Sequence, residues 1–162
     1  MKNSIALCPG SFDPVTVGHL DIISRAAAMF GKVIVVVASN AAKTPLFTAE
    51  ERVAMIRRAT AELPNVTVEQ YDGLLAEYAR LTGADVIVKG LRAVSDFEYE
   101  FQMALTNKKL NPAVDTVFLT ARAENMYLSS SIVKQIGSMG GDIDGFVPAA
   151  VREDVLARLQ KQ

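Results

Sequence analysis

The chain has 162 residues, a length at which a single compact domain can build its own hydrophobic core. Its 17 basic and 18 acidic residues give a net charge of −1, which argues against a broadly basic surface for nucleic acid or a membrane. One histidine and one cysteine exclude a histidine-built metal centre, zinc-finger spacing and an intramolecular disulfide. No uninterrupted apolar stretch of about 20 residues occurs. We therefore expect a cytoplasmic protein that neither enters a membrane nor binds nucleic acid, and that builds no metal site of its own.

Short β-branched runs alternate with amphipathic helical patterns along the chain. The first half predicts, in order, strand Ile5–Cys8, a helix through Leu20, Ile23, Ala27 and Phe30, strand Val33–Ala38, a helix that starts at a capping box of Thr48 and Glu51, and strand Val66–Gln70. The second half predicts helix Leu74–Leu81, strand Val86–Val88, helix Phe97–Leu110, strand Thr116–Leu119 and helix Val151–Leu159. Because the valine and isoleucine runs lack polar alternation, we expect parallel strands covered on both faces. The prediction is one α/β domain over residues 1–162, with an open five-stranded parallel sheet and a C-terminal helical segment.

The loops that follow the strands are where a ligand should bind, because open parallel sheets bind ligands beyond the carboxyl ends of their strands. These loops contain Lys43, Lys89, Arg92 and the only histidine, His19, and the loop after the last strand ends in three consecutive serines. Cations gathered on one rim of a near-neutral protein indicate a phosphate site.

No phosphate-binding loop of the G-x-x-x-x-G-K-[ST] type occurs, and no G-x-G-x-x-G, so a Walker-type kinase and a standard dinucleotide dehydrogenase lose their main support. Thr16, Val17, Gly18 and His19 stand instead where the first loop enters a helix. Thr16 can cap that helix, Gly18 can let a phosphate approach the backbone amides, and His19 can face the phosphate as a neutral N–H donor. The alternative is that His19 is only a structural residue.

The first loop, P-G-S-F-D-P-V-T-V-G-H, resembles the [TH]-x-G-H signature of the nucleotidyltransferase superfamily. The combination with V-K-G-L-R, D-F-E-Y-E and S-S-S-I-V-K at these separations is most similar to the phosphopantetheine adenylyltransferase family, over nearly the whole chain. The resemblance implies a Rossmann-like sheet and transfer of the adenylyl group of ATP to 4'-phosphopantetheine, which yields dephospho-coenzyme A and pyrophosphate. It also implies Mg²⁺ carried on ATP, a homohexamer, and coenzyme A as an inhibitor.

The resemblance also implies a role for individual residues. It gives catalytic roles to His19, as transition-state stabiliser, and to Lys43, Lys89 and Arg92. The implied ATP site consists of Ser11, Phe12, His19, Gly90, Leu91, Arg92, Glu100, Asn125, Met126, Tyr127, Leu128, Ser129, Ser130 and Ser131. The implied acceptor site consists of Ser11, Lys43, Leu75 and Lys89. Ser11 and Lys89 stand where many relatives carry Thr and Arg, which keeps the hydroxyl and the charge but loses the bidentate geometry of arginine.

Several of these residues also have a simpler structural interpretation. Lys43, taken alone, would be a solvated loop residue. The role of Arg92 could be limited to a salt bridge with Asp96. Glu98 could complete a capping box with Ser95. The serines of residues 129–131 could serve as a helix cap and have no other role. Two other functions also remain open: transfer to a different phosphate acceptor, such as nicotinamide mononucleotide or a phosphorylated alcohol, and a non-catalytic module that binds adenylates or coenzyme A.

Overall fold

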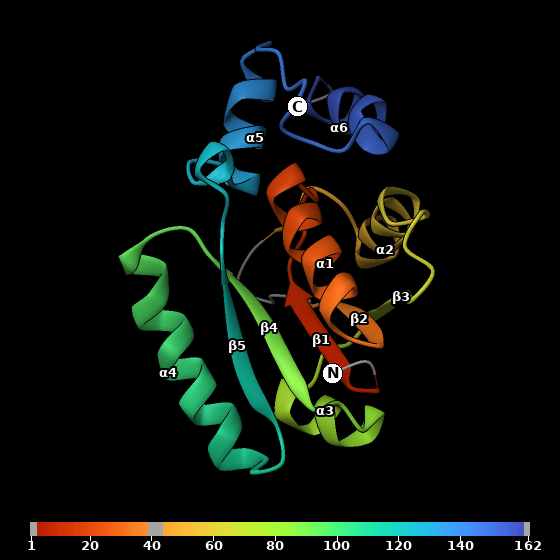
Figure 1. The fold of residues 1–162 in the computed structure, drawn as a ribbon. Helices are drawn as coiled ribbons and strands as arrows, with labels where there is room; N and C mark the ends of the chain where they lie inside the picture. The colour runs from red at the N-terminus through yellow and green to blue at the C-terminus, as the bar shows by residue number, and fades with distance from the viewer. Residues whose placement is uncertain (1–2, 39–43, 161–162) are drawn as a thin grey trace.

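The computed structural model describes residues 3–38 and 44–160, so the predicted site residue Lys43 lies outside the described residues. Its centre is a five-stranded parallel sheet with the strand order β3-β2-β1-β4-β5 (Figure 1). The strands are β1 (Ile5–Gly10), β2 (Lys32–Val37), β3 (Val66–Gln70), β4 (Val86–Leu91) and β5 (Asp115–Thr120). The predicted α/β class and all five predicted strands are confirmed.

Strand β4 is longer than predicted, and this moves three expected loop residues onto the sheet. Lys89, Gly90 and Leu91 pair in register with Phe118, Leu119 and Thr120 of β5. The glycine and the lysine hid this continuation because neither residue type favours strands. Side chains at the end of β4 are therefore held by the sheet rather than by a loop.

The described residues form six α-helices around the sheet and beyond the carboxyl ends of its strands. They are α1 (Val17–Met29), α2 (Ala49–Ala59), α3 (Leu75–Thr82), α4 (Val94–Leu110), α5 (Ser130–Ser138) and α6 (Arg152–Leu159), with short 3₁₀ turns at Ala123–Asn125 and Ala149–Val151. Helix α4 starts at Val94 after Ala93, which gives no side-chain cap, so the proposed pairing of Ser95 with Glu98 as a capping box is wrong. The nine-residue helix α5 was not in the predicted series of elements, although a helix cap at residues 129–131 was considered.

The two faces of the sheet support two separate cores, and strand β2 contributes to both. Val33, Val35 and Val37 belong to the larger core, which also contains buried residues of α1, α2, α5 and α6. Ile34 and Val36 point to the other face and pack in a smaller core with Tyr78 and Ala79 of α3. Burial on both faces explains why β2 has no polar alternation.

The C-terminal segment closes one end of the molecule. In Figure 1 the arrowhead of β1 points toward α5 and α6, which lie beyond the carboxyl ends of the strands. Val155 and Leu159 of α6 are buried in the larger core together with Val133 of α5. The segment therefore forms a wall at the end of the sheet where a ligand is expected. Within residues 3–38 and 44–160, no helix has the length and apolar content needed to span a bilayer.

Gly83 caps the C-terminus of helix α3 and adopts a left-handed backbone conformation with φ 65°. No atom lies within 4 Å of the position that a β-carbon would take there. A side chain at residue 83 is therefore disfavoured by the backbone conformation and not by a steric clash. We expect Gly83→Ala to lower the free energy of unfolding by about 1 kcal/mol and Gly83→Asn to lower it by much less, because asparagine tolerates this conformation. Urea unfolding of both variants measures the difference. Equal losses in the two variants would contradict a left-handed cap at this residue.

Candidate active site

A cleft of about 980 Å³ opens at the carboxyl ends of the strands, a size suited to nucleotide-sized ligands. The predicted site residues that line it are Ser11, Phe12, His19, Lys89, Gly90, Arg92, Glu100, Asn125, Leu128, Ser129, Ser130 and Ser131. The structure thus brings together residues from the ends of β1 and β4 and from the loop after β5. Four predicted residues do not line the cleft: Leu75 packs against the smaller core, Leu91 lies at the end of β4, and Met126 and Tyr127 are exposed.

The strand order divides the cleft into two halves. The ends of β2 and β3 lie on one side of β1, and the ends of β4 and β5 lie on the other. The connections reverse direction between β1 and β4, which is the switch point where open α/β sheets bind their ligands. Two ligands bound side by side would therefore meet in front of the loop that follows β1.

The loop after β1 is compact because an aromatic ring fills its interior. Phe12 is buried, has φ 51°, and meets the ring of His19 edge-on with 5.0 Å between the ring centroids. A β-carbon on Gly10 would lie 2.9 Å from the Phe12 ring, so a larger residue there would force this buried ring to shift. At Gly18 a β-carbon would make only ordinary contacts, the nearest at 3.5 Å from the Thr16 hydroxyl. Packing therefore does not demand glycine at residue 18.

The spacing of Thr16 and His19 forms a capping box at the start of α1. The Thr16 hydroxyl accepts a hydrogen bond from the His19 backbone N–H at 3.2 Å, and the Thr16 backbone N–H donates to Nδ1 of His19 at 3.0 Å. Histidine thus takes the position that glutamate or glutamine occupies in most capping boxes. Because Nδ1 accepts a hydrogen bond, the hydrogen-bond network places the proton of the neutral ring on Nε2.

The His19 ring is also kept neutral by its surroundings. Burial, together with the nearby positive charges of Arg92 and Lys89, lowers its pKa from 6.5 to about 4. At neutral pH the residue is therefore a hydrogen-bond donor through Nε2 and carries no charge. This arrangement suits the stabilisation of negative charge that develops on a ligand during a reaction.

The two cations on the β4 side of the cleft are paired with carboxylates. Lys89 Nζ lies 3.1 Å from Glu100, and Arg92 Nε lies 3.2 Å from Asp96. The pairing of Arg92 with Asp96 is the structural interpretation considered for this residue. Arg92 also donates from Nη1 to the carbonyl of Leu128 at 2.9 Å, which joins the end of β4 to the loop after β5.

The serines after β5 have both structural and binding capacity. Ser129 caps α5 by accepting a hydrogen bond from the backbone N–H of Ile132 at 3.2 Å, as the structural interpretation expected. Ser130 donates to the carbonyl of Pro14 at 2.8 Å and so ties α5 to the loop after β1. The start of α5 therefore faces the cleft, where free backbone N–H groups favour an anion.

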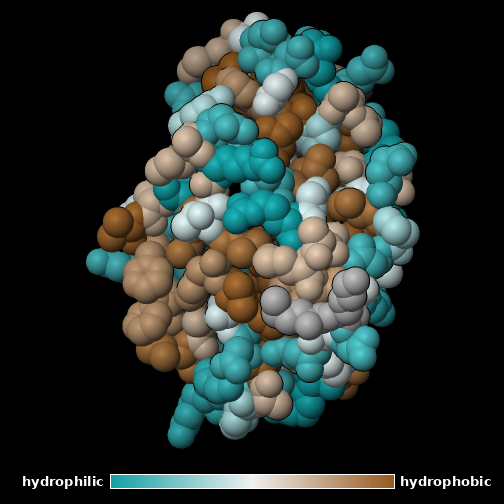
Figure 2. Space-filling model, viewed as in Figure 1, coloured by the Kyte–Doolittle hydropathy of each residue, from teal (hydrophilic) through white to brown (hydrophobic). Residues whose placement is uncertain are grey.

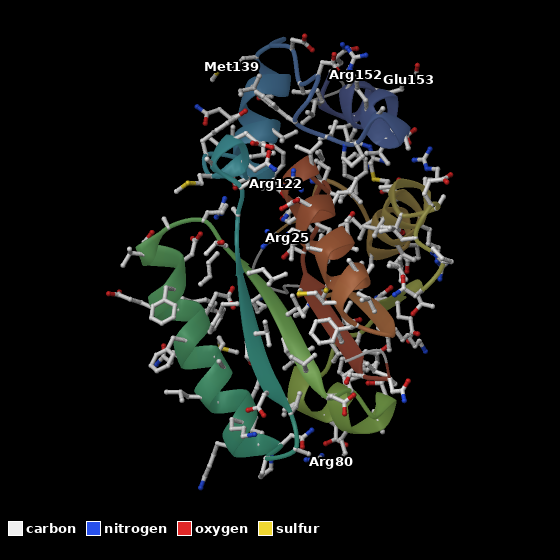
Figure 3. All side chains as sticks on the ribbon, in the orientation of Figure 1. Arg25, Arg80, Arg122, Met139, Arg152 and Glu153 are labelled. Carbon is white, nitrogen blue, oxygen red and sulfur yellow. The ribbon has the colours of Figure 1, made fainter. Side chains whose placement is uncertain are left out.

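The loop after β5 is attached to α1 by a cluster of charges (Figure 3). Asp21 on α1 pairs with Arg122 of the loop at 2.8 Å and with Arg25 at 3.2 Å. Arg25 also donates to the carbonyl of Thr120 at 2.8 Å. These contacts fix the position of the loop that carries residues 125–131.

Sequence reasoning missed four further charged residues that line the cleft: Asp13, Arg52, Asp72 and Lys134. Asp13 and Arg52 are buried, with 7% and 3% of their surface exposed. Asp13 and Lys134 lie inside the sequence motifs that carry the family resemblance, which was the available signal. Among the described residues, no group of three or more histidine, cysteine or acidic side chains is arranged to hold a metal ion.

Comparison with known proteins identifies similar sequences. The cytidylyltransferase-like family matches residues 7–136. The chain is 54% identical to the phosphopantetheine adenylyltransferase of Caldanaerobacter subterraneus, over 97% of this chain and 98% of the relative. It is also 54% identical to that of Clostridium kluyveri, over 98% of this chain and 96% of the relative. A solved structure assigned as a nicotinate-nucleotide adenylyltransferase from Vibrio parahaemolyticus covers 96% of each chain with a TM-score of 0.68 at 16% identity, which shows a shared fold.

The low pKa of His19 makes stability depend on pH in a defined window. Above pH 6.5 the ring is neutral in both the folded and the unfolded chain, but between pH 6.5 and 4 only the unfolded chain takes up the proton. Folding stability should therefore decrease as the pH falls through this window. His19→Gln keeps a capping-box residue but cannot titrate, so we expect its stability relative to the native protein to rise as the pH falls from 7 to 4. Urea unfolding at several pH values measures this, and parallel curves would contradict a neutral His19.

Proposed function

This chain belongs to the cytidylyltransferase-like family and, within it, to the phosphopantetheine adenylyltransferases, and we propose that it transfers the adenylyl group of ATP to 4'-phosphopantetheine. The products are dephospho-coenzyme A and pyrophosphate. The observation that carries the proposal is the state of His19. Its ring is neutral and is held in a capping box with Thr16, and its Nε2 proton is available in a cleft that also holds Lys89 and Arg92.

The chemistry needs no strong base. The acceptor is a phosphate monoester, and its oxygen is already negatively charged at neutral pH. That oxygen attacks the α-phosphorus of ATP, a new P–O bond forms, and the bond to the bridging oxygen of the β-phosphate breaks as pyrophosphate leaves. Catalysis then consists of in-line positioning and charge stabilisation, which His19 Nε2, Lys89 and Arg92 can supply.

The two halves of the cleft suit the two substrates. ATP takes the side of β4 and β5, in contact with Gly90, Arg92, Glu100, Asn125 and residues 128–131, and it meets Ser11, Phe12 and His19 at the end of β1. The acceptor takes the side of β2 and β3, where Ser11 and Lys43 hold its phosphate together with Lys89. Lys89 reaches both substrates because β4 is the direct neighbour of β1.

The remaining components follow from the substrates and the family. Mg²⁺ enters as the complex with ATP, because triphosphate oxygens are the ligands that this ion prefers. Coenzyme A shares the pantetheine and adenylate groups of the product and inhibits by occupying the same cleft. The free buried thiol of Cys8 supports a reducing cytoplasmic location.

The proposed assembly is a homohexamer, and the surface of α4 supports a self-association interface. Asn107 is the one buried residue of this helix. Its exposed apolar side chains are gathered on one edge of the molecule (Figure 2) and include Val94, Phe97, Tyr99, Phe101, Met103 and Leu105. A contiguous apolar surface of this kind is typical of a protein interface rather than of a free monomer surface.

The proposed reaction is tested by product analysis. With ATP, Mg²⁺ and 4'-phosphopantetheine, we expect pyrophosphate and dephospho-coenzyme A in equal amounts. Pantetheine, which lacks the phosphate, serves as the control acceptor and should yield almost no product. Formation of ADP instead of pyrophosphate would show attack at a different phosphorus and would overturn the proposal.

The role of His19 is tested by measuring its contribution to catalysis separately from its contribution to capping α1. His19→Ala should lower kcat by at least about 10²-fold, the scale for loss of one donor to a transition state, with a much smaller change in ATP affinity. Thr48→Ala is the matched control, because it removes the cap hydroxyl of an equivalent capping box on α2. The control should lose about 1 kcal/mol of stability while its kcat stays near the native value. A His19→Ala variant that melts early but reacts at the native rate would make His19 a structural residue.

A further inference from the structure

Arg52 is a buried cation in the wall of the cleft. It lies on α2 with 3% of its surface exposed, and it lines the cleft near Ser11. Arginine is almost never buried unless its charge is paired. Its position therefore calls for a physical reason beyond the packing of α2.

The guanidinium of Arg52 connects three separate segments through their backbone carbonyls. Its Nη1 donates to the carbonyl of Ser11 at 2.7 Å and to the carbonyl of Ala38 at 3.2 Å, and its Nε donates to the carbonyl of Thr48 at 3.3 Å. Ala38 in turn donates its N–H to the carbonyl of Gly10 at 3.0 Å. One side chain thus fixes the ends of β1 and β2 to each other and to the start of α2.

The charge of Arg52 is balanced by carbonyl dipoles alone among the described residues. Within that part of the chain it forms no ion pair, whereas the cleft residues Arg92, Lys89 and Lys134 each have a carboxylate partner. Removing a charge from water without a counter-ion is costly, and carbonyl hydrogen bonds recover only part of that cost. An anion that enters the cleft beside Arg52 would recover more of it.

We propose that Arg52 is a positioning residue for the acceptor, which holds Ser11 in place and attracts the acceptor phosphate through its buried charge. This inference rests on the proposed function. The acceptor rather than ATP is indicated because Arg52 contacts the ends of β1 and β2, whereas Arg92 and the segment 125–131 lie on the side of β4 and β5.

The test compares two substitutions with a control on the same helix. Arg52→Gln removes the charge, and Arg52→Lys keeps it but loses the planar fork of donors. Arg57→Gln is the control, because exposed Arg57 also donates to a backbone carbonyl, that of Val68 at 3.0 Å, but does not line the cleft. Steady-state kinetics give KM for each substrate, and thermal melting with and without 4'-phosphopantetheine gives stability and binding.

For Arg52→Gln we expect KM for 4'-phosphopantetheine to rise about tenfold or more, the scale for losing a charge near a partly buried phosphate. KM for ATP should rise much less than KM for the acceptor, because ATP meets Ser11 only at the end of β1 and its other proposed contacts lie on the side of β4 and β5. Arg52→Lys should show a smaller rise in the acceptor KM. Arg57→Gln should leave both KM values unchanged.

Three results would overturn the inference. The first is a folded Arg52→Gln variant with the native acceptor KM, and the second is an equal rise in KM for both substrates, since a purely structural role predicts either one. If Arg52→Gln does not fold, a native acceptor KM in Arg52→Lys is the third. A native protein that neither turns over nor is stabilised by 4'-phosphopantetheine would contradict the proposed function and this inference together. Native turnover with any of the three results contradicts the inference alone.

Discussion

The buried carboxylate of Asp13 is the interaction on which the active cleft depends. Its two oxygens accept hydrogen bonds from the backbone N–H groups of Leu46 and Phe47, both at 2.9 Å, and one oxygen also pairs with Lys134 at 3.2 Å. The loop after β1 is irregular and buried, so its neighbours cannot satisfy their backbone groups through regular secondary structure. A carboxylate can satisfy several donors at once, and Asp13 thereby joins the loop after β1 to the segment before α2 and to α5. Arg52 satisfies backbone carbonyls of the same region, those of Ser11 and Ala38.

The start of α1 combines a structural need with a chemical one. A helix must satisfy its first backbone N–H groups, and Thr16 and His19 do so through a capping box. Using histidine at the third helical position fixes the ring by two contacts to Thr16 and leaves Nε2 free of the cap. The same residue therefore stabilises the helix and presents a donor to the cleft. Loss of the ring should affect both properties, which is why a cap-only control is needed to separate them.

Sequence patterns predicted the sheet because each strand contains a short apolar or β-branched run, the longest of them in β2. They predicted α2 because Thr48 and Glu51 form a capping box. They missed the start of α4, which has no side-chain cap, and they missed α5, whose nine residues carry too short a periodic pattern.

The predicted site residues were chosen because strand ends converge at one edge of a sheet, and that rule depends only on topology. The burial of Arg52 could not be predicted in the same way. Its partners Ser11 and Ala38 are 41 and 14 residues away in the sequence, and no local pattern marks a charge that long-range carbonyl contacts hold inside the protein. The role of Lys43 stays a prediction, since this residue lies outside the described part of the chain.

The balance of charge in the cleft explains how a protein of net charge −1 can take two polyanionic substrates. Lys89, Arg92 and Lys134 are each held by a carboxylate, so their charges cost little when the cleft contains only water. A phosphate that replaces such a carboxylate gains only the difference between two ion pairs, which limits the affinity for substrates and products alike. Lower product affinity favours release, so pairing these cations trades binding strength for turnover. Arg52 differs because its partners are carbonyls, so it can attract an anion without first giving up a carboxylate.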